Sequence, residues 1–373
     1  MVKKSFMYSR CMAVAGKEVM HILRDPFTIA IAIIMPIVLV TYFGFAIDFN
    51  FKNIKLAVYD SDNSRLSREL LRTFYSSGYF VLNDIRDTAN PILEVESERS
   101  DASLIIKPGF GRKMIEGRNA GIQLLVDGSD NMKAGVISGY LAGIHKSFLA
   151  GARSYPGERI KVKTRFLYNP ELNTRWFVVP GLIVVLAGLL GILLTSLTIA
   201  REWENGSMEL LLSTPVTPLE IVTGKILPYI VLQLVGIAFV FLTARSVFYV
   251  PFRGSYTLFA ITCIVFITAT LAQGIMISVI TRQQQKAMQM SILIGLLPSL
   301  LLSGFIFPIE SMPVIFKYIT ALLPPRWFMV IIRGLFLKGT GIAELALPVA
   351  SLITICFVLV AAAAGRLKKD LEP

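Results

Sequence analysis

The sequence predicts an α-helical polytopic membrane protein with six transmembrane helices and an α/β extracytoplasmic domain inserted between the first two. Apolar residues make up 54% of the chain and charged residues 17%, whereas soluble domains are roughly 25% charged. Predominantly apolar stretches of about 20 residues, the length that crosses a bilayer as a helix, recur along the chain. Residues 48–175 interrupt them with the mixed composition of a soluble domain.

The six predicted spans are Phe27–Ile47, Phe177–Ile199, Leu219–Ala244, Thr257–Ile280, Met288–Ile309 and Ile342–Ala364. Lys and Arg collect on the cytoplasmic side of membrane proteins, and they cluster here before the first span and after the last. We therefore expect a multi-pass protein of the cell inner membrane with both termini in the cytoplasm. Arg201, Arg282 and Lys286 mark two internal cytoplasmic loops. The basic residues within 326–338 fall on the extracytoplasmic side of this arrangement, so they do not follow the cytoplasmic preference of Lys and Arg.

Residues 1–26 predict an amphipathic helix on the cytoplasmic membrane surface. Apolar residues recur at three- and four-residue spacing, which gives one stripe: Met7, Cys11, Val14, Ala15, Val19, Ile22 and Leu23. Asp25-Pro26 ends this pattern, because a residue before proline avoids helical backbone. An extension of the first span, residues 27–47, is the alternative. A cleaved signal peptide is disfavoured, because apolar cores of signal peptides are only about 7–15 residues long.

The inserted segment alternates strand and helix patterns, which favours a small α/β sheet covered by helices. Strands are predicted at 54–59, 79–83, 102–106, 122–126 and 160–167. Helices are predicted at 65–76, 91–99, 110–116 and 132–150. The insert contains no cysteine, so no disulfide is expected in it.

A polar segment, residues 201–217, joins the second and third predicted spans and has its own helix punctuation. Asn205-Gly206-Ser207 is expected to end one helix and start a short one, which Thr214-Pro215 stops. Thr217-Pro218-Leu219-Glu220 is a capping box with proline at the first helical position. A separately capped amphipathic segment at a membrane surface is typical of a binding site for a soluble partner. A tight linker with solvated charges is the alternative, but it explains neither Leu210–Leu212 nor the two helix stops.

Catalytic and cofactor motifs are not apparent in the sequence. The two histidines and three cysteines do not stand at metal-ligand spacing, so no metal site is expected. The nearest approach to a nucleotide-binding P-loop, residues 334–341, lacks the lysine after its second glycine. We therefore expect no enzyme activity and no cofactor in this chain. The net charge of +12 is attributed to the cytoplasmic ends of the spans, so nucleic acid is not an expected partner.

Two groups of motifs resemble the permease subunit of type-2 ATP-binding-cassette exporters, in the branch with a large extracytoplasmic loop. The first group comprises Arg201–Glu209, Leu211–Pro215 and Gly224-Lys225. The second comprises Ser303–Ile309, Met312-Pro313, Leu323–Arg326 and Arg333-Gly334. Ser207 stands where the family often has threonine, which is also a β-hydroxyl residue.

This resemblance implies partners for the chain. A separate ATPase subunit would bind ATP and Mg and dock on the polar segment, and the N-terminal helix would be a second contact. The export pathway would form in the lipid bilayer from two copies of the permease or from a pair with a sister permease. A periplasmic adaptor protein is left open, and the default substrate is an amphipathic compound such as a drug or lipid.

The resemblance also implies site residues. The ATPase-coupling residues would be Arg201, Glu202, Glu204, Gly206, Met208, Glu209, Leu211, Leu212, Thr214 and Pro215. The pathway-lining residues would be Thr195, Ser196, Thr198, Ser291, Ser299 and Ser303, although hydroxyls in a span also bond their own helix backbone. Residues 308–333, interrupted by four prolines, would form short helices that dip into the outer face.

Two other classes of function are weighed against the exporter. A membrane-anchored sensor would use the inserted domain to bind a ligand, but the sequence shows no cytoplasmic signalling domain. A membrane-embedded enzyme would need a paired acid and base or a metal site within the spans, and none is apparent in the sequence.

Overall fold

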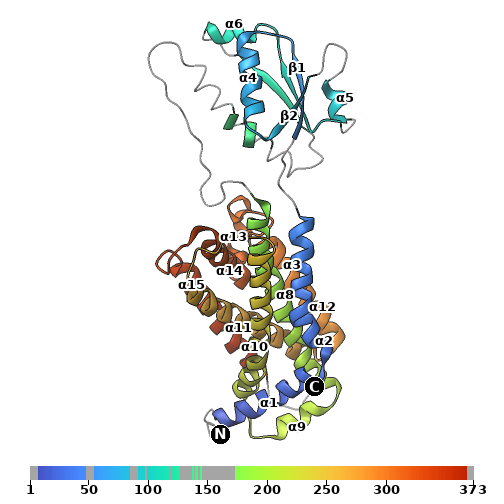
Figure 1. Cartoon of the computed structure of the whole chain (residues 1–373). Helices are drawn as coiled ribbons and strands as arrows, with labels where there is room; N and C mark the ends of the chain where they lie inside the picture. Colours follow the sequence, from blue (N-terminus) through green and yellow to red (C-terminus); the bar gives the residue numbers. More distant parts are fainter. Residues whose placement is uncertain are drawn as a thin grey trace. The chain divides into compact units, whose positions relative to one another are not determined.

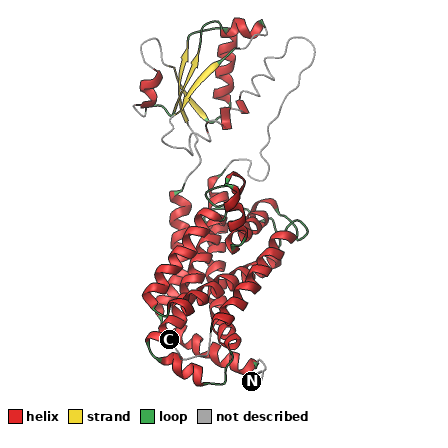
Figure 2. Ribbon diagram, turned by 180° about the vertical axis from the view of Figure 1, so that it is seen from behind, coloured by secondary structure: helices red, strands yellow, loops and turns green. Residues whose placement is uncertain are grey.

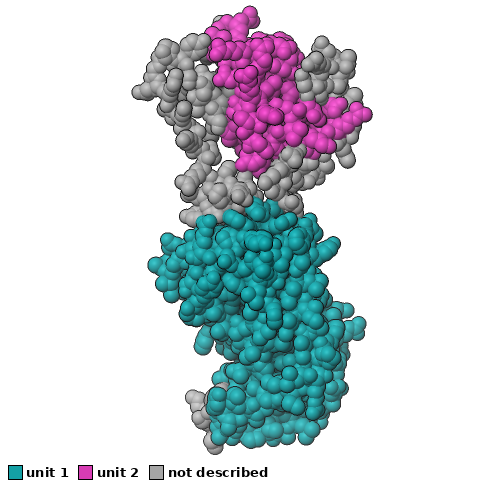
Figure 3. Space-filling view, viewed as in Figure 1, with its two compact units in different colours: residues 1–47, 173–373 teal, residues 48–172 magenta. Residues whose placement is uncertain are grey.

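The computed structural model describes residues 7–47, 54–84, 91–96, 99–116, 120–126, 137, 139–141, 143–144 and 173–367. The chain divides into two compact units (Figure 3). Residues 1–47 and 173–373 form the helical unit, and residues 48–172 form the inserted unit. Each unit is described by itself.

The inserted unit contains a four-stranded sheet (Figure 2). Its elements in chain order are β1 (Ile54–Asp60), α4 (Arg65–Ser76), β2 (Phe80–Asp84), α5 (Pro91–Glu96), β3 (Ala102–Ile106), α6 (Phe110–Ile115) and β4 (Ile122–Val126). The strand order is β2-β1-β3-β4, in which β1 is parallel to both neighbours and β4 is antiparallel to β3. The predicted helix at 91–99 ends three residues early. The described positions of the predicted helix 132–150 are helical, and the predicted strand 160–167 lies outside the described residues.

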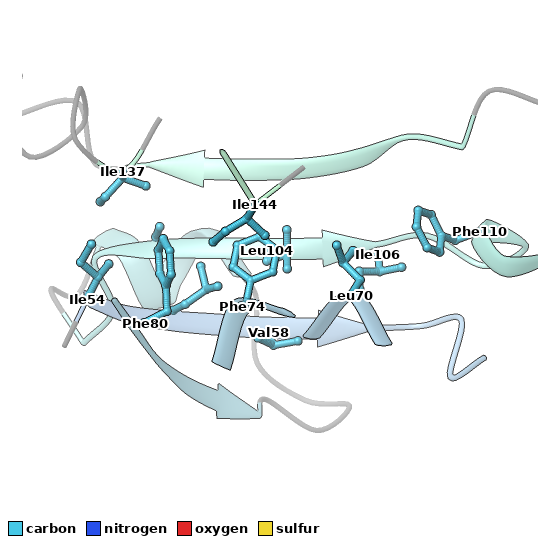
Figure 4. Close-up of a cluster of buried hydrophobic side chains, with 12 residues drawn as sticks. Ile54, Val58, Leu70, Phe74, Phe80, Leu104, Ile106, Phe110, Ile137 and Ile144 are labelled. Carbon is cyan, nitrogen blue, oxygen red and sulfur yellow. The ribbon is translucent and has the colours of Figure 1, made fainter. Parts of the chain in front are cut away.

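The core of this unit lies between the sheet and α4. Leu70 and Phe74 of α4 are fully buried against Leu104 and Ile106 of β3 (Figure 4). Ser64 caps α4 by accepting a hydrogen bond from the Ser67 amide at 3.1 Å, as Ser/Thr/Asp/Asn residues do at helix starts.

The loop between β1 and α4 is joined to the start of α6 by Asp62. Its carboxylate accepts hydrogen bonds from the backbone amides of Gly109 (2.6 Å) and Gly111 (2.8 Å). Burial opposes ionisation of Asp62, but hydrogen bonds from Ser64 and these amides outweigh it and hold the pKa of Asp62 below its ordinary value.

In the helical unit, six helices of the described residues are long and apolar enough to cross a membrane, as predicted. Their bounds are Pro26–Ala46, α8 (Thr174–Glu204), α10 (Pro218–Ser246), α11 (Tyr256–Thr281), Gln284–Leu302 and α15 (Ala346–Arg366). The first comprises α2 (Pro26–Ile29), a π-turn at Ala30–Ile34 and α3 (Met35–Ala46). The fifth comprises α12 (Gln284–Leu297) and a second π-turn, Pro298–Leu302.

Several predicted spans differ in extent from the helices that carry them. The helix of the second span, α8, continues past Ile199 to Glu204 and includes Arg201 and Glu202. The fifth does not reach Ile309, because the helix ends at Leu302 and the backbone turns through Gly304, whose φ is +85°. Apolar residues continue past that turn, so composition alone places the boundary too late.

The long helix α8 is the centre of the helical unit. It packs against α3, α10, α11, α12 and α14 (Pro324–Arg333). Its contact with α11 is close, since a Cβ added at Gly274 of α11 would overlap the Thr195 hydroxyl and the Ile192 carbonyl oxygen of α8. The Thr195 hydroxyl also donates to the Leu271 carbonyl at 2.8 Å, so small and polar residues join the helices as in other membrane bundles.

The predicted re-entrant segment, residues 308–333, contains two short helices. α13 (Val314–Ala321) meets the helix Pro324–Lys338 at an angle of 87°, which is the geometry of a broken span or a re-entrant loop. Arg333 fixes this region, because its guanidinium donates to the Gly304 carbonyl at 2.9 Å and stacks 4.0 Å above the Phe177 ring centroid. Within the helical unit, α13 lies at the end opposite to α1 (Tyr8–Arg24) and α9 (Ser207–Ser213), as Figures 1 and 2 show.

Candidate functional site

The segment between α8 and α10 forms a short helix of its own. α8 ends at Glu204, Gly206 takes a left-handed conformation with φ of +69°, and α9 runs from Ser207 to Ser213. Thr217 and Glu220 form a reciprocal capping box at the start of α10. The predicted order of helix, break, short helix, break and helix is confirmed.

α9 has one buried residue and one strongly exposed apolar residue. Met208 is fully buried, whereas Leu210 is 73% exposed and Glu209 is exposed beside it. Leu211 is half-buried, and its carbonyl accepts from the Thr214 hydroxyl at 2.6 Å. The side chain of Leu212 lies outside the described residues. Met208 therefore anchors α9 to the helical unit, whereas Leu210 makes little contact with it.

The N-terminal helix α1 packs along α10. A Cβ at Gly224 would lie 2.7 Å from the Cys11 carbonyl oxygen, so only glycine permits this approach. The Met7 amide donates to Glu220 at 2.6 Å, and Arg10 donates to the Pro215 carbonyl at 2.9 Å. α1 is therefore bound both to α10 and to the segment that carries α9.

Part of the predicted apolar stripe of α1 packs against the rest of the helical unit, and its contact with the membrane surface stays a prediction. Cys11, Val14, Ala15 and Ile22 are buried, but Met7, Val19 and Leu23 are exposed. The remaining buried residue of α1 is Glu18, which is only 4% exposed.

Glu18 belongs to a group of charges where three helices meet, which we call the four-charge cluster: Lys17 and Glu18 of α1, Glu202 of α8 and Lys225 of α10. Lys225 is 1% exposed and is paired with both Glu18 and Glu202, the latter at 3.2 Å. Lys17 reaches the same Glu202 carboxylate at 2.6 Å. The cluster contains two positive and two negative charges and joins three helices, as buried charges require partners.

Glu202, one of the predicted ATPase-coupling residues, lies within the four-charge cluster, and its coupling role stays a prediction. Its side chain points into the four-charge cluster and is 10% exposed. Glu204, one residue beyond Trp203, accepts from the Gln284 amide at 2.8 Å and so joins α8 to the start of α12. Arg282 stacks 4.7 Å from the Trp203 ring centroid at the same junction.

Arg201 also lies at a junction between helices. It pairs with Asp25 at 3.8 Å and donates to Gln284 at 3.4 Å. Asp25 caps α2 by accepting from Phe27 and Thr28. Burial opposes its ionisation, but these hydrogen bonds and Arg201 hold the pKa of Asp25 below its ordinary value.

Lys17, Glu18 and Lys225 are site residues that the sequence analysis did not assign to the candidate site. A signal for two of them was present, because Glu18 lies between Val14 and Ile22 of the apolar stripe and Lys225 lies inside a predicted span. An ionisable group at such a position needs a partner of opposite charge.

The six predicted pathway hydroxyls are all buried within this chain. Five of them donate to a carbonyl three or four residues earlier in the chain: Thr195, Ser196, Thr198, Ser291 and Ser303. The Ser299 hydroxyl has no hydrogen-bond partner among the described residues. Their place in an export pathway stays a prediction.

These features define the class of the protein: an integral membrane protein with several apolar spans and a separate short helix between two of them. The chain belongs to the family described as ABC-2 family transporter protein, which its residues 26–364 match. The resemblance to ABC exporter permeases is thereby confirmed.

Curated relatives agree over most of the chain. It is 31% identical to the probable multidrug ABC transporter permease YbhS of Escherichia coli strain K12, over 95% of this chain and 94% of the relative. It is 30% identical to the probable multidrug ABC transporter permease YbhR of the same strain, over 90% and 92%. It is 31% identical to the inner membrane transport permease YhhJ, also of that strain, over 77% of each chain.

Proposed function

We propose that this chain is the membrane-spanning subunit of an ATP-driven exporter and that a separate ATPase subunit docks on α9. The observation that carries the proposal is the exposed Leu210, presented by a short helix that Met208 anchors between α8 and α10. ATP and Mg would bind to the ATPase partner. This chain would supply half of the pathway and pair with a second copy or a sister permease.

The four-charge cluster supports a route for the ATPase movement. Separating α1, α8 or α10 from the others would leave a buried charge without its partner, which is strongly unfavourable. A force on α9 would therefore move the ends of α8 and α10 together with α1. Since α8 is the central helix, this movement would reach the spans packed around it.

The substrate class and membrane sidedness complete the proposal. An amphipathic compound such as a drug or lipid is the proposed substrate, in keeping with relatives named as probable multidrug permeases. Both termini would lie in the cytoplasm, and residues 48–175 outside it. The grouping of α1 and α9 at one end of the helical unit supports this arrangement (Figure 1). A periplasmic adaptor remains an open additional partner.

Leu210→Asp should abolish copurification of the ATPase subunit while leaving the amount of permease in the membrane unchanged. The substitution places a charge in the apolar contact, and burying an unpaired charge is costly. Glu204→Lys combined with Glu209→Lys should weaken the same contact by charge reversal. The measurement is ATPase recovered per permease after affinity purification.

Ser213→Asp is the matched control, because it adds the same charge at an exposed position of the same helix. It should retain the partner. Full partner recovery and full export by Leu210→Asp would show that α9 is only a linker.

Cysteine labelling tests the sidedness. In a variant without Cys11, Cys263 and Cys356, Ser76→Cys in α4 should react with a membrane-impermeant maleimide in intact cells. Ser213→Cys in α9 should react only after lysis. Both positions are exposed, so accessibility to solvent does not separate them. The reverse pattern would overturn the proposed topology.

A further inference from the structure

The helical unit contains a cavity of about 680 Å³ beside the four-charge cluster. Residues of α1, the first span, α8, α10 and α12 line it. This volume lies within the range of about 300–1,000 Å³ that is usual for small-molecule sites. Neither the coupling role of α9 nor the packing of the spans requires a cavity here.

The lining is apolar on one side and charged on the other. Ile31 of the first span, Leu193 and Leu197 of α8 and Met288 of α12 supply apolar surface. Charged side chains of both signs line the other side of the cavity: Lys17, Glu18, Asp25, Arg201 and Glu202. Such a wall suits a molecule with an apolar body and one polar head.

Glu202 specifies the chemistry of that head. The side chain of Glu202 is 10% exposed, and its Oε1 atom forms ion pairs with the ammonium groups of both Lys17 and Lys225. Its Oε2 atom is buried and has no hydrogen-bond partner within the described part of the chain. An ionised carboxylate oxygen only accepts hydrogen bonds, so the missing partner is a donor.

Lys17 can be displaced from Glu202 by another positively charged group. Its side chain is 43% exposed, whereas that of Lys225 is 1% exposed. Lys17 can therefore turn into solvent when another cation reaches Glu202, and the carboxylate stays neutralised throughout. A ligand ammonium would take its place at the cost of one ion pair, in which only the lysine is substantially exposed.

We infer that this cavity binds an amphipathic amine, with its ammonium donating to Glu202 and its apolar chain lying against Leu193 and Leu197. The inference rests on the proposed export function, because it assigns the substrate class of that exporter. Binding would also release Lys17 from Glu202 and so loosen α1 from α8.

The test is binding of radiolabelled dodecylamine to the purified full chain in a non-ionic detergent, with dodecanol as competitor. Binding should be saturable, and dodecanol should compete about tenfold more weakly, as expected for the loss of one charge-assisted hydrogen bond. Leu197→Trp, which fills the cavity, should weaken dodecylamine binding by about the same factor. Val231→Trp, on the exposed face of α10, is its matched control and should bind as the unaltered chain does.

Lys17→Ala gives a result that misfolding cannot imitate, because it should bind dodecylamine more tightly than the unaltered chain. Glu202→Gln should remove the preference for the amine over the alcohol. Non-saturable binding, equal competition by dodecanol, or unchanged affinity in both Leu197→Trp and Lys17→Ala would overturn the inference.

The assay contains no ATPase, so its failure is distinguishable from failure of the proposed function. If dodecylamine does not bind but the ATPase still copurifies, only the substrate assignment is wrong. If dodecylamine binds but no ATPase is recovered, the docking proposal is wrong and the amine site stands.

Discussion

Replacing Lys225 with methionine is expected to destabilise the folded permease by about 3–5 kcal/mol, the usual result of removing one partner from a buried ion pair. Lys225 is 1% exposed and touches Glu18 and Glu202. Methionine fills a similar volume but leaves two buried carboxylates close together with only Lys17 nearby. The measurement is the free energy of unfolding in detergent, together with the amount of protein in the membrane.

The controls use the other members of the four-charge cluster. Lys17→Met removes an ion pair whose lysine is 43% exposed, so its effect should be about 1 kcal/mol or less. Glu18→Gln combined with Lys225→Met should recover part of the lost stability, because one unpaired carboxylate is then removed. If Lys225→Met is no more damaging than Lys17→Met, the cluster does not hold the three helices together.

Gly274→Ala should have the second largest effect, about 2–3 kcal/mol of lost stability. The added Cβ would overlap the Ile192 carbonyl oxygen and the Thr195 hydroxyl, and a backbone oxygen in the middle of α8 cannot move aside. α8 and α11 would have to separate, which also breaks the hydrogen bond from Thr195 to Leu271. Thermal unfolding in detergent and export activity are the two measurements.

Gly365→Ala is the matched control, because it makes the same change in an apolar helix, α15, where an added Cβ meets nothing within 4 Å. It should be neutral or slightly stabilising, since alanine is the better helix former. Equal behaviour of the two variants would contradict the close packing of α8 and α11.

Local sequence signals predicted the spans and the short helix between the second and third. Apolar composition locates a span. Gly206 and Thr214 flank the short helix and Thr217 caps the next one, so each helix end can be predicted from a few neighbouring residues. The span ends were less readable, because the chain turns at Gly304 while apolar residues continue to Ile309.

The four-charge cluster could not be predicted in the same way. Lys225 and Glu18 are 207 positions apart, so their pairing depends on how α1 packs along α10. That packing depends in turn on the absence of a side chain at Gly224. Periodicity shows that a helix has an apolar face but does not show which charge will lie within it, so the stripe of α1 did not reveal that Glu18 would be buried.

The separation between Glu18 and Lys225 also has a consequence for how the protein is made. Chains fold from the N-terminus during synthesis, so α1 emerges from the ribosome long before α10. Until the third span is complete, Glu18 lacks its cation and α1 is expected to stay in contact with water. A nascent chain arrested before α10 should therefore expose Cys11 to a soluble thiol reagent, whereas the finished protein buries it. Insertion of the third span is thus the step at which we expect the N-terminal helix to become fixed, and the time taken to translate residues 25–246 would set the delay.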